Sequence, residues 1–365
     1  MKRTLCIVNP FEHGGGAEYQ IALLIDTLDR VGGFDVHYLA HFLDLRARTR
    51  SYEIARIGRG GAIPRLGYLV EARSLHRLLE ARAPAVIYQR VGCGYTAVCA
   101  HYAQRHGIPL VWHVAHDTEV MPRQLEQGRN KLRLHLEKRA LEWAIRRATR
   151  IVVQTAHQGA LLREHYGRDA AAVIGNFQPP AREVLDKSGP TTVLWIANLK
   201  PWKRPEVFVR LAEAFAQRTD VRFVMVGAAA AGSRNRAWQE QLLARIGALG
   251  NLEYAGEKTQ AEVEALLARA HIFVNTSTHE GFPNTFIQAW LRDVAVVSLS
   301  VDPDGILERA RVGMRAGSEA GLVRAVGELI DQPALRAQYA RRGREHALAH
   351  HSMANAERLI DQLRA

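Results

Sequence analysis

Short apolar runs alternate with helical patterns along most of the 365-residue chain. A strand buried on both faces appears in sequence as a short continuous apolar run, and two parallel strands need a crossover, usually a helix, between them. The alternation therefore predicts parallel sheets with helices on both faces. In the first half of the chain the runs are Leu5–Val8, Val36–Ala40, Ala85–Tyr88, Pro109–Trp112 and Ile151–Gln154.

Prolines interrupt this alternation between Asn176 and Pro190, and the run Val193–Ile196 restarts it. A proline-rich break between two periodic segments is typical of a linker. We therefore predict an α/β protein with two Rossmann-like domains facing across a cleft. The N-terminal domain is expected at residues 1–178 and the C-terminal domain at residues 190–348.

Composition is that of a soluble globular protein, with 47% hydrophobic and 24% charged residues. No apolar run approaches the roughly 20 residues that cross a bilayer. The first apolar run ends at Val8, which is too short for a secretory signal, so we expect a cytoplasmic location. The cysteines lack metal-ligand spacing and suit a reducing compartment; they are Cys6, Cys93 and Cys99.

The formal charge of +12 and the pI near 9.9 indicate an acidic partner. Nucleic acid, an anionic membrane surface and a phosphate-bearing substrate all fit such a charge. Binding of nucleic acid is disfavoured, because the cations are scattered over loops and are not interleaved with stacking aromatic residues on one face. Composition does not choose between the other two.

Three segments carry more specific structural expectations. The Arg- and Gly-rich stretch 46–65 is predicted to be a long mobile loop, and Asp302–Gly305 is expected to continue the second sheet. Residues 123–150 are predicted to be helical and contain nine Lys or Arg against three Glu, with leucines and a tryptophan between them. Such a helix can lie on anionic lipid or pack as an ordinary surface helix, and both interpretations are open.

The stretch Ile272–Trp290 has the order strand, turn, helix. Its turn begins at Glu280, and Gly281 lets the backbone come close to a ligand. Pro283 fixes φ just before a helix cap expected at Asn284 or Thr285. The first N–H groups of such a helix can donate to anions and sugar hydroxyls at the carboxyl edge of the sheet. We therefore predict a ligand-binding turn.

This stretch resembles the glutamate-x7-glutamate segment of retaining glycosyltransferases of the GT-B fold, family 4. Glu280 matches the first acid, and Gln288 stands where the second acid usually is. The resemblance implies that Glu280 and the following residues hold the donor sugar, while position 288 meets the ribose. Those following residues are Gly281, Phe282, Pro283, Asn284 and Thr285. It also implies that a final helix, within residues 349–365, crosses back to the first domain.

A second motif follows the strand Val193–Ile196. The family commonly has an arginine and, five residues later, a lysine that together neutralise the donor diphosphate. Lys203 matches the lysine, whereas Asn198 replaces the arginine. Lys200 or Arg204 either compensates for the missing cation or is simply solvated. The resemblance also assigns recognition of the nucleotide base to the backbone at Gly256, Glu257 and Lys258.

Three features of the first half of the chain lie directly after predicted strands. A glycine run between the first strand and first helix is a generic phosphate or sugar site, or simply a tight turn; the resemblance assigns Gly15 and Gly16 to the acceptor and diphosphate region. His116 aligns with a family histidine that faces the donor sugar and leaving phosphate. The alternative for His116, and also for His113, is a structural role in capping turns. Arg90 is either a phosphate ligand or part of a salt bridge.

The resemblance implies a retaining transfer of sugar from a nucleotide-diphosphate donor to an acceptor hydroxyl in cell-surface polysaccharide or lipopolysaccharide synthesis. Glu280, Lys203 and His116 are the expected catalytic residues, and neither a metal nor another cofactor is expected. The acceptor would be a glycan or a lipid-linked molecule, reached from the cytoplasmic face of the inner membrane by peripheral contact. A nucleotide-sugar epimerase of the same fold and a noncatalytic sugar-binding relative are the alternatives.

Overall fold

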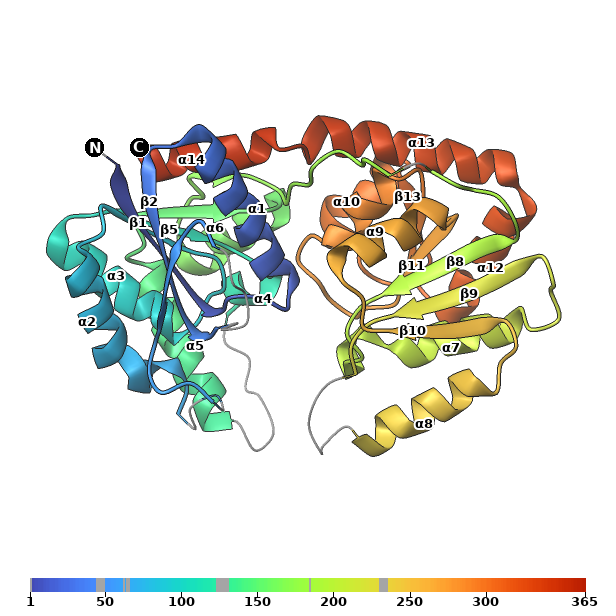
Figure 1. The fold of residues 1–365 in the computed structure, drawn as a ribbon, viewed down its shortest axis with the longest axis horizontal. Coiled ribbons are helices and arrows are strands. Elements are labelled where there is room, and N and C mark those ends of the chain that lie inside the picture. The colour runs from blue at the N-terminus through green and yellow to red at the C-terminus, as the bar shows by residue number, and fades with distance from the viewer. Residues whose placement is uncertain are drawn as a thin grey trace. The chain divides into compact units, whose positions relative to one another are not determined.

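The structure is a computed structural model that describes residues 2–43, 50–61, 63, 66–122, 131–183, 185–229 and 236–365. The chain divides into two compact units (Figure 1). Unit 1 contains Met1–Phe177 together with Met353–Ala365, and unit 2 contains Gln178–Ser352. Each unit is built on its own parallel sheet, which confirms the prediction of two Rossmann-like α/β domains.

Unit 1 has a seven-stranded parallel sheet in the order β3-β2-β1-β4-β5-β6-β7. The strands are β1 (Arg3–Phe11), β2 (Phe34–Phe42), β3 (Glu53–Arg56), β4 (Val86–Gln89), β5 (Leu110–His113), β6 (Arg150–Val153) and β7 (Ala172–Val173). The helices are α1 (Gly16–Val31), η1 (Tyr68–Glu71), α2 (Ala72–Arg82), α3 (Gly94–His106), α4 (Asp117–Val120), α5 (Lys131–Ile145), α6 (Ala156–Tyr166) and α14 (Ala354–Arg364).

Alternate residues of β1 enter two different cores, because successive side chains of a strand point to opposite faces of the sheet. Cys6 and Val8 belong to the core that includes residues of α2, α3 and α5. Leu5 and Ile7 belong to the core that includes residues of α1 and α14. Burial on both faces explains why β1 has no polar alternation in the sequence.

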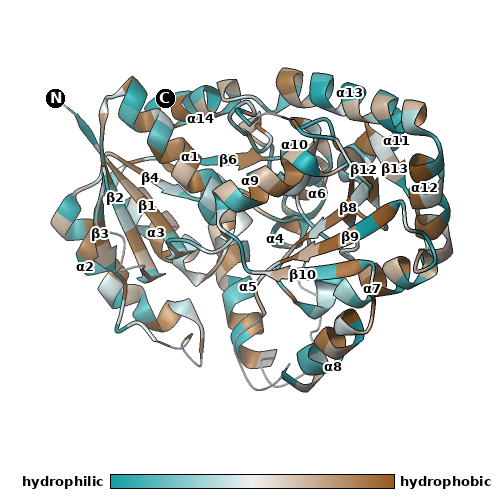
Figure 2. Ribbon diagram, turned by 45° about the vertical axis from the view of Figure 1, so that its right-hand side comes forward, coloured by the Kyte–Doolittle hydropathy of each residue, from teal (hydrophilic) through white to brown (hydrophobic). Residues whose placement is uncertain are grey.

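The last helix, α14, packs in unit 1 although the chain reaches it from unit 2. Its apolar side chains Leu359, Ile360 and Leu363 lie in the same core as Ile21 and Leu24 of α1. The helix begins at Ala354, inside the expected range 349–365, and the preceding helix ends at His350. Figure 2, coloured by hydropathy, shows apolar segments on both α1 and α14.

Unit 2 has a six-stranded parallel sheet in the order β10-β9-β8-β11-β12-β13. The strands are β8 (Thr191–Ile196), β9 (Val221–Val226), β10 (Leu252–Gly256), β11 (Ile272–Asn275), β12 (Ala295–Ser298) and β13 (Gly313–Arg315). The helical segments are η2 (Pro201–Lys203), α7 (Pro205–Ala214), α8 (Arg236–Gly247), α9 (Gln260–Arg269), α10 (Asn284–Trp290), η4 (Pro303–Gly305), α11 (Ile306–Arg309), α12 (Glu319–Asp331) and α13 (Pro333–His350).

Close packing of α13 against α10 depends on a glycine. A Cβ atom at Gly343 would lie 2.2 Å from Cδ1 of Trp290, a side chain with no exposed surface. The indole Nε1 of Trp290 donates to the Val312 carbonyl at 2.8 Å, so the ring cannot move away without losing a buried hydrogen bond. This contact supports α10, the helix that follows the Glu280 turn.

Three structural expectations were wrong in detail. Asp302–Gly305 does not continue the sheet: Pro303–Gly305 forms η4, and the last strand is β13. Pro303 has no N–H to donate, and Asp304 has a φ of 54°, so neither suits the hydrogen-bond ladder of a sheet.

The stretch 46–65 is not one long loop, because it contains the edge strand β3, whose partly exposed residues gave no clear alternation in the sequence. Residues 44–49, 62 and 64–65 lie outside the described residues.

The basic segment 123–150 is not one helix. Its described helical part is α5, which ends at Ile145, and Arg150 already begins β6. The chain leaves the helix through a tight turn in which the Arg147 N–H donates to the Ala144 carbonyl at 2.8 Å. Residues 123–130 lie outside the described residues.

Candidate functional site

Lys203 and Glu280 meet at the carboxyl edge of the sheet in unit 2. Lys203 lies in η2, just after β8, and Glu280 lies in the loop after β11. These two strands are neighbours in the sheet, so their carboxyl ends lie side by side. The Lys203 Nζ atom is 2.5 Å from Glu280 Oε1, although 77 positions separate the residues in sequence. The structure thus brings together the two motifs of the second half.

Two polar residues, Asn275 at the end of β11 and Ser277 just after it, support the Glu280 carboxylate. Ser277 Oγ donates to Oε1 at 2.7 Å, and Asn275 Nδ2 lies 3.4 Å from the same oxygen. Burial raises the pKa of Glu280, but Lys203 and these hydrogen bonds outweigh burial and hold the pKa below its ordinary value. Glu280 is therefore ionised at neutral pH. It suits accepting hydrogen bonds from sugar hydroxyls and does not suit acting as a general acid.

The loop that carries Lys203 is tied to the β11 loop through its backbone. Thr276 Oγ1 donates to the Lys203 carbonyl at 2.6 Å and accepts from Trp195 Nε1 at 2.9 Å. The Thr278 N–H donates to the Trp202 carbonyl at 2.9 Å. These hydrogen bonds hold the two loops together independently of the ion pair between Lys203 and Glu280. Sequence reasoning missed Asn275, Thr276 and Ser277, although three consecutive polar residues at the end of a buried strand were a usable signal.

The two further cations of the Lys203 motif have partners within unit 2. Arg204 Nη2 donates to Glu319 Oε1 at 2.7 Å, and Glu319 also binds Arg210. Lys200 Nζ lies 5.1 Å from the centre of the Trp202 ring, which is a cation–π distance. Arg204 is thus already neutralised by a carboxylate, so Lys203 is the better placed of these cations to meet a diphosphate.

The turn after Glu280 enters α10 one residue earlier than expected. Pro283 is the N-cap, with extended φ and ψ of −66° and 122°, so Asn284 is the first helical residue and neither it nor Thr285 is the cap. Phe282 and Gln288 are buried, at 9% and 4% exposure. A glutamate at position 288 would bury a charge, which costs considerable desolvation free energy. The uncharged amide of Gln288 avoids burying a charge.

Gly227 lies directly after β9, at the carboxyl edge of the same sheet. Its N–H donates to the Gly256 carbonyl at 2.9 Å, and its carbonyl accepts from Tyr254 OH at 2.7 Å. With a φ of 154°, its backbone approaches that of Ala197 so closely that a Cβ atom would lie 1.7 Å from the Ala197 oxygen. This contact positions Asn198, the next residue. Gly227 was absent from the predicted site residues.

The predicted base-recognition segment follows β10. Gly256 has a φ of 70°, and Glu257 and Lys258 lead into the N-terminus of α9. Lys258 Nζ lies 3.3 Å from Glu262 Oε1, and Glu262 also forms a capping box with Thr259. The Lys258 side chain is thus engaged with its own helix, which leaves the backbone of this segment as the part that can meet a base.

In unit 1, Gly15 and Gly16 begin α1, as the position of the glycine run predicted. Gly15 is the N-cap and Gly16 the first helical residue. The Glu18 carboxylate lies beside Gly15, where Oε2 is 2.4 Å from the position of a Cβ atom, and Oε1 accepts from Asn9 Nδ2 at 2.9 Å. A carboxylate of the protein itself therefore neighbours this helix start, which favours sugar hydroxyls over phosphates as its ligands.

Arg90 is buried in unit 1, and no salt bridge joins it to another described residue, while a role as phosphate ligand stays a prediction. Its side chain is only 1% exposed. Nη1 donates to His113 Nδ1 at 2.7 Å and Nη2 donates to Asn176 Oδ1, so its partners in the described part of the chain are neutral. His113 Nε2 donates to the Ile174 carbonyl at 3.0 Å. Burial and the Arg90 charge lower the pKa of His113 well below its ordinary value, which assigns this histidine a structural role.

His116 forms the N-cap of α4 at the carboxyl edge of the unit 1 sheet. Its Nδ1 accepts from the Thr118 N–H at 3.1 Å and from Thr118 Oγ1 at 2.9 Å. The capping interpretation is therefore correct, and it also orients the ring. Because Nδ1 is an acceptor, the neutral ring carries its proton on Nε2, the tautomer that can donate to a sugar hydroxyl or phosphate oxygen.

Glu119, three residues beyond His116, predicts a pH-dependent stability. Burial raises its pKa to about 7, although the Ala115 and Gly92 N–H groups partly oppose this. The folded state therefore holds a proton that the unfolded state releases near pH 4.5, so stability falls as pH rises from about 4.5 to 7. Between pH 5 and pH 8, the free energy of unfolding of Glu119→Gln should rise by on the order of 3 kcal/mol relative to that of the native protein.

Urea unfolding of both proteins at the two pH values measures this difference. Glu164→Gln is the matched control, because Glu164 lies on the exposed side of α6 in the same unit. An equal pH dependence of stability in the native protein and in Glu119→Gln would contradict the expectation.

Both halves of the chain match glycosyltransferase family models. Residues 14–182 match the family described as Glycosyltransferase Family 4, and residues 190–332 match Glycosyl transferases group 1. The fold is similar to that of sucrose-phosphate synthase from Thermosynechococcus elongatus, with a TM-score of 0.78 and 16% identity over 100% of this chain and 98% of that one. The chain belongs to the GT-B glycosyltransferases.

This glycosyltransferase is also similar to three further proteins. It is 26% identical over 180 residues to the lipopolysaccharide core biosynthesis glycosyltransferase LpsE of Rhizobium meliloti (strain 1021), a match that covers 47% of this chain and about half, 51%, of that protein. Anabaena HepE in complex with UDP and glucose has a TM-score of 0.75 and 18% identity, over 99% of this chain and 98% of that one. WaaG, a lipopolysaccharide biosynthesis glycosyltransferase, has a TM-score of 0.77 and 14% identity, with 99% of each chain covered.

The described residues contain neither a metal site nor a membrane span. In that part of the glycosyltransferase, no three His, Cys, Asp or Glu side chains gather as a metal site. None of the helices in the described ranges is both long enough and apolar enough to cross a bilayer.

Proposed function

We propose that this glycosyltransferase moves a sugar from a nucleotide-diphosphate donor to an acceptor hydroxyl and retains the anomeric configuration, as in family 4. The observation that carries the proposal is the pairing of Lys203 with Glu280 at the carboxyl edge of the unit 2 sheet. In open α/β sheets ligands bind at this edge. HepE, which has the same fold, was solved in complex with UDP and with UDP-glucose, which supports a nucleotide-sugar donor.

Each residue of the pair has a distinct role in the proposed reaction. Lys203 turns its ammonium group to the donor diphosphate and stabilises the negative charge that develops on the leaving group. Glu280 then accepts hydrogen bonds from the sugar hydroxyls, which orients the ring. Gly281 to Thr285 line the sugar, Gln288 meets the ribose, and residues 256–258 meet the base.

The transfer proceeds on one face of the sugar. The bond between the anomeric carbon and the diphosphate oxygen breaks while the acceptor oxygen bonds to that carbon from the same side. The acceptor proton passes to the departing diphosphate oxygen, so no carboxylate nucleophile and no metal is required. His116 Nε2–H assists by donating a hydrogen bond to the sugar or the phosphate.

A thermal-shift panel of UDP-, GDP- and ADP-sugars tests the donor class. One donor is expected to raise the melting temperature of the native protein, because a ligand that binds only the folded state stabilises it. The shift should persist with EDTA and disappear in Lys203→Ala. A panel in which no activated sugar shifts the melting temperature would remove the proposal.

Product analysis separates the remaining alternatives. NMR of the product formed with the stabilising donor should show the anomeric configuration of that donor. An altered nucleotide sugar formed without any acceptor would identify an epimerase. Donor binding without turnover for any offered glycan or lipid-linked acceptor would identify a noncatalytic sugar-binding relative.

The proposed acceptor belongs to cell-surface polysaccharide or lipopolysaccharide synthesis, which agrees with the role of LpsE. Such an acceptor is held by lipid at the cytoplasmic face of the inner membrane. A cytoplasmic enzyme with a net charge of +12 is attracted to that anionic surface. The protein should therefore pellet with anionic vesicles at low salt and be released at high salt.

A further inference from the structure

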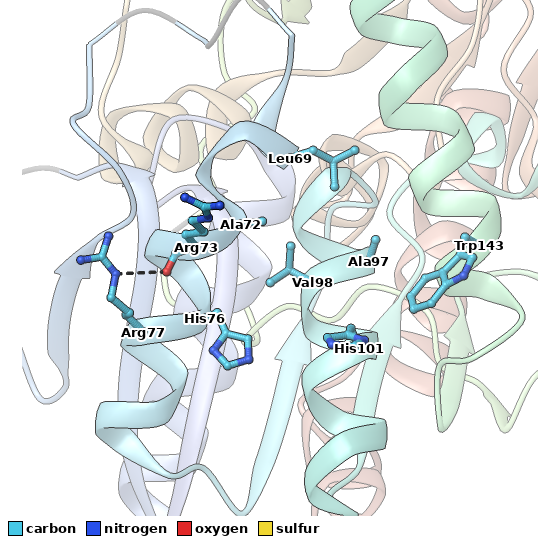
Figure 3. A pocket seen from close by; sticks show the side chains of 9 residues that line it. All are labelled: Leu69, Ala72, Arg73, His76, Arg77, Ala97, Val98, His101 and Trp143. Atoms are coloured by element: carbon cyan, nitrogen blue, oxygen red, sulfur yellow. Dashed lines mark hydrogen bonds between the residues drawn. The ribbon is translucent and has the colours of Figure 1, made fainter.

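An open groove of about 610 Å³ lies on unit 1, over α3 and between α2 and α5 (Figure 3). Figure 3 shows α2 on one side, α3 beneath and the Trp143 ring of α5 on the other side. The groove has no role in the proposed chemistry. Its apolar lining consists of Leu69, Ala72, Ala97, Val98 and Trp143.

Apolar side chains are exposed on two of the elements that contribute to this groove, η1 and α5. Leu132 is 60% exposed and Val70 is 56% exposed, while Trp143 in the groove wall is 36% exposed. Leu132 and Trp143 are 11 positions apart on α5, which is about three helical turns, so both lie on the same side of the helix. Exposed apolar side chains on the elements that line a groove indicate a contact surface.

The rim of the groove is positively charged. Arg73 and Arg77 lie one turn apart on α2, and both are exposed. Neither forms an ion pair with a described residue, whereas the neighbouring acid Glu80 is engaged with His76 and His106, at 3.8 and 3.1 Å. On the opposite wall, Arg147 Cζ lies 4.2 Å from the centre of the Trp143 ring. A hydrocarbon floor between cationic walls is complementary to a molecule with an apolar tail and an anionic head.

The distribution of charge over the chain agrees with this complementarity. Unit 1 contains 27 Lys or Arg against 18 Asp or Glu, so it carries nine of the twelve net positive charges. A second copy of the same unit would bring the same positive surface and would be repelled. An anionic lipid is attracted by the whole unit before any contact with the groove is made.

We propose that this groove binds an acyl chain of an anionic phospholipid, with the lipid phosphate on Arg73 and Arg77. The proposal deepens the membrane contact of the proposed function, and it does not depend on the donor site. The acyl chain packs against Val98, Ala97 and the Trp143 ring, and this burial adds an apolar contribution to the electrostatic attraction. The basic helix α5 thus contacts lipid through the side that carries Trp143, not merely through its charges.

Vesicles with brominated acyl chains test whether the tail enters the groove, because bromine quenches nearby tryptophan fluorescence. We expect brominated phosphatidylglycerol vesicles to quench the full-length protein more than unbrominated ones do. Most of this difference should vanish in Trp143→Phe. Ala97→Trp fills the groove and should reduce pelleting with the unbrominated vesicles. No added quenching by brominated lipid, or equal added quenching in Trp143→Phe, overturns the proposal.

The charged rim is tested with a matched pair of double variants. Arg73→Glu with Arg77→Glu should weaken binding to phosphatidylglycerol vesicles by at least about 10-fold, since each cation near the surface contributes about 1 kcal/mol. Arg309→Glu with Arg324→Glu makes the same charge change on exposed positions of unit 2 and should change binding by less than about 3-fold. Equal losses for the two double variants would show attraction by net charge alone and overturn the proposal.

Two controls separate lipid binding in the groove from dimer formation and from damage to the donor site. Light scattering without lipid should give a mass that is the same for the native protein and Ala97→Trp; a dimer abolished by that variant would identify a second copy as the occupant and overturn the proposal. The thermal shift by the nucleotide-sugar donor should be unchanged in all these variants. If no nucleotide sugar shifts the melting temperature while brominated lipid still quenches Trp143, only the proposed function is contradicted.

Discussion

Lys203→Ala is expected to lower kcat/KM for sugar transfer by about 10²–10³-fold, which is the usual cost of removing one group that stabilises transition-state charge. Lys203 Nζ already lies at the edge of the sheet, held 2.5 Å from Glu280, and the cation Arg204 is neutralised by Glu319. The diphosphate therefore has no equivalent replacement within this motif. Initial rates with the donor that stabilises the native protein measure the loss.

Two variants accompany this measurement. Lys203→Arg keeps the charge and should retain more activity than Lys203→Ala. Arg245→Ala removes the cation of an exposed pair in the same unit, 2.7 Å from Glu213, and should leave the rate within about 2-fold of the native value. If Lys203→Ala were as active as Arg245→Ala, Lys203 would have no part in the chemistry.

Gly227→Ala is expected to destabilise unit 2 by about 3–5 kcal/mol, because strained backbone and overpacking both contribute. The residue has a φ of 154°, and the new Cβ atom would lie 1.7 Å from the Ala197 oxygen. Backbone atoms at the ends of β8 and β9 would have to move apart, which also displaces Asn198 at the predicted donor site. Urea unfolding and the donor thermal shift measure the two consequences.

Gly247→Ala is the control for this substitution. Gly247 is the last residue of α8, and a Cβ atom there would have no neighbour within 4 Å. Alanine is the better helix former, so stability should stay the same or rise by up to about 1 kcal/mol. A Gly227→Ala protein as stable as Gly247→Ala would contradict the close approach between Gly227 and Ala197.

Local patterns in the sequence predicted much of this protein. Buried parallel strands leave short apolar runs, so the two sheets and the break between them were readable without coordinates. The Glu280 turn and the Lys203 loop were placed correctly at strand ends, because strand, turn and helix follow one another within about 20 residues. Segments without such a pattern were misjudged: β3 is short and half-buried at an edge, and η4 follows a strand without continuing the sheet.

Tertiary structure alone decided which side chains meet and which are buried. The contact between Lys203 and Glu280 depends on β8 and β11 being neighbours in the sheet, and strand order is a long-range property that local periodicity does not carry. Arg90 illustrates the opposite outcome, since a charged residue after a strand is usually solvated but here donates to His113 inside unit 1. The sequence by itself determined the elements and the chemistry available at their ends. Only the packing of distant segments decided how that chemistry is combined, because burial and hydrogen bonding depend on neighbours that the chain order does not name.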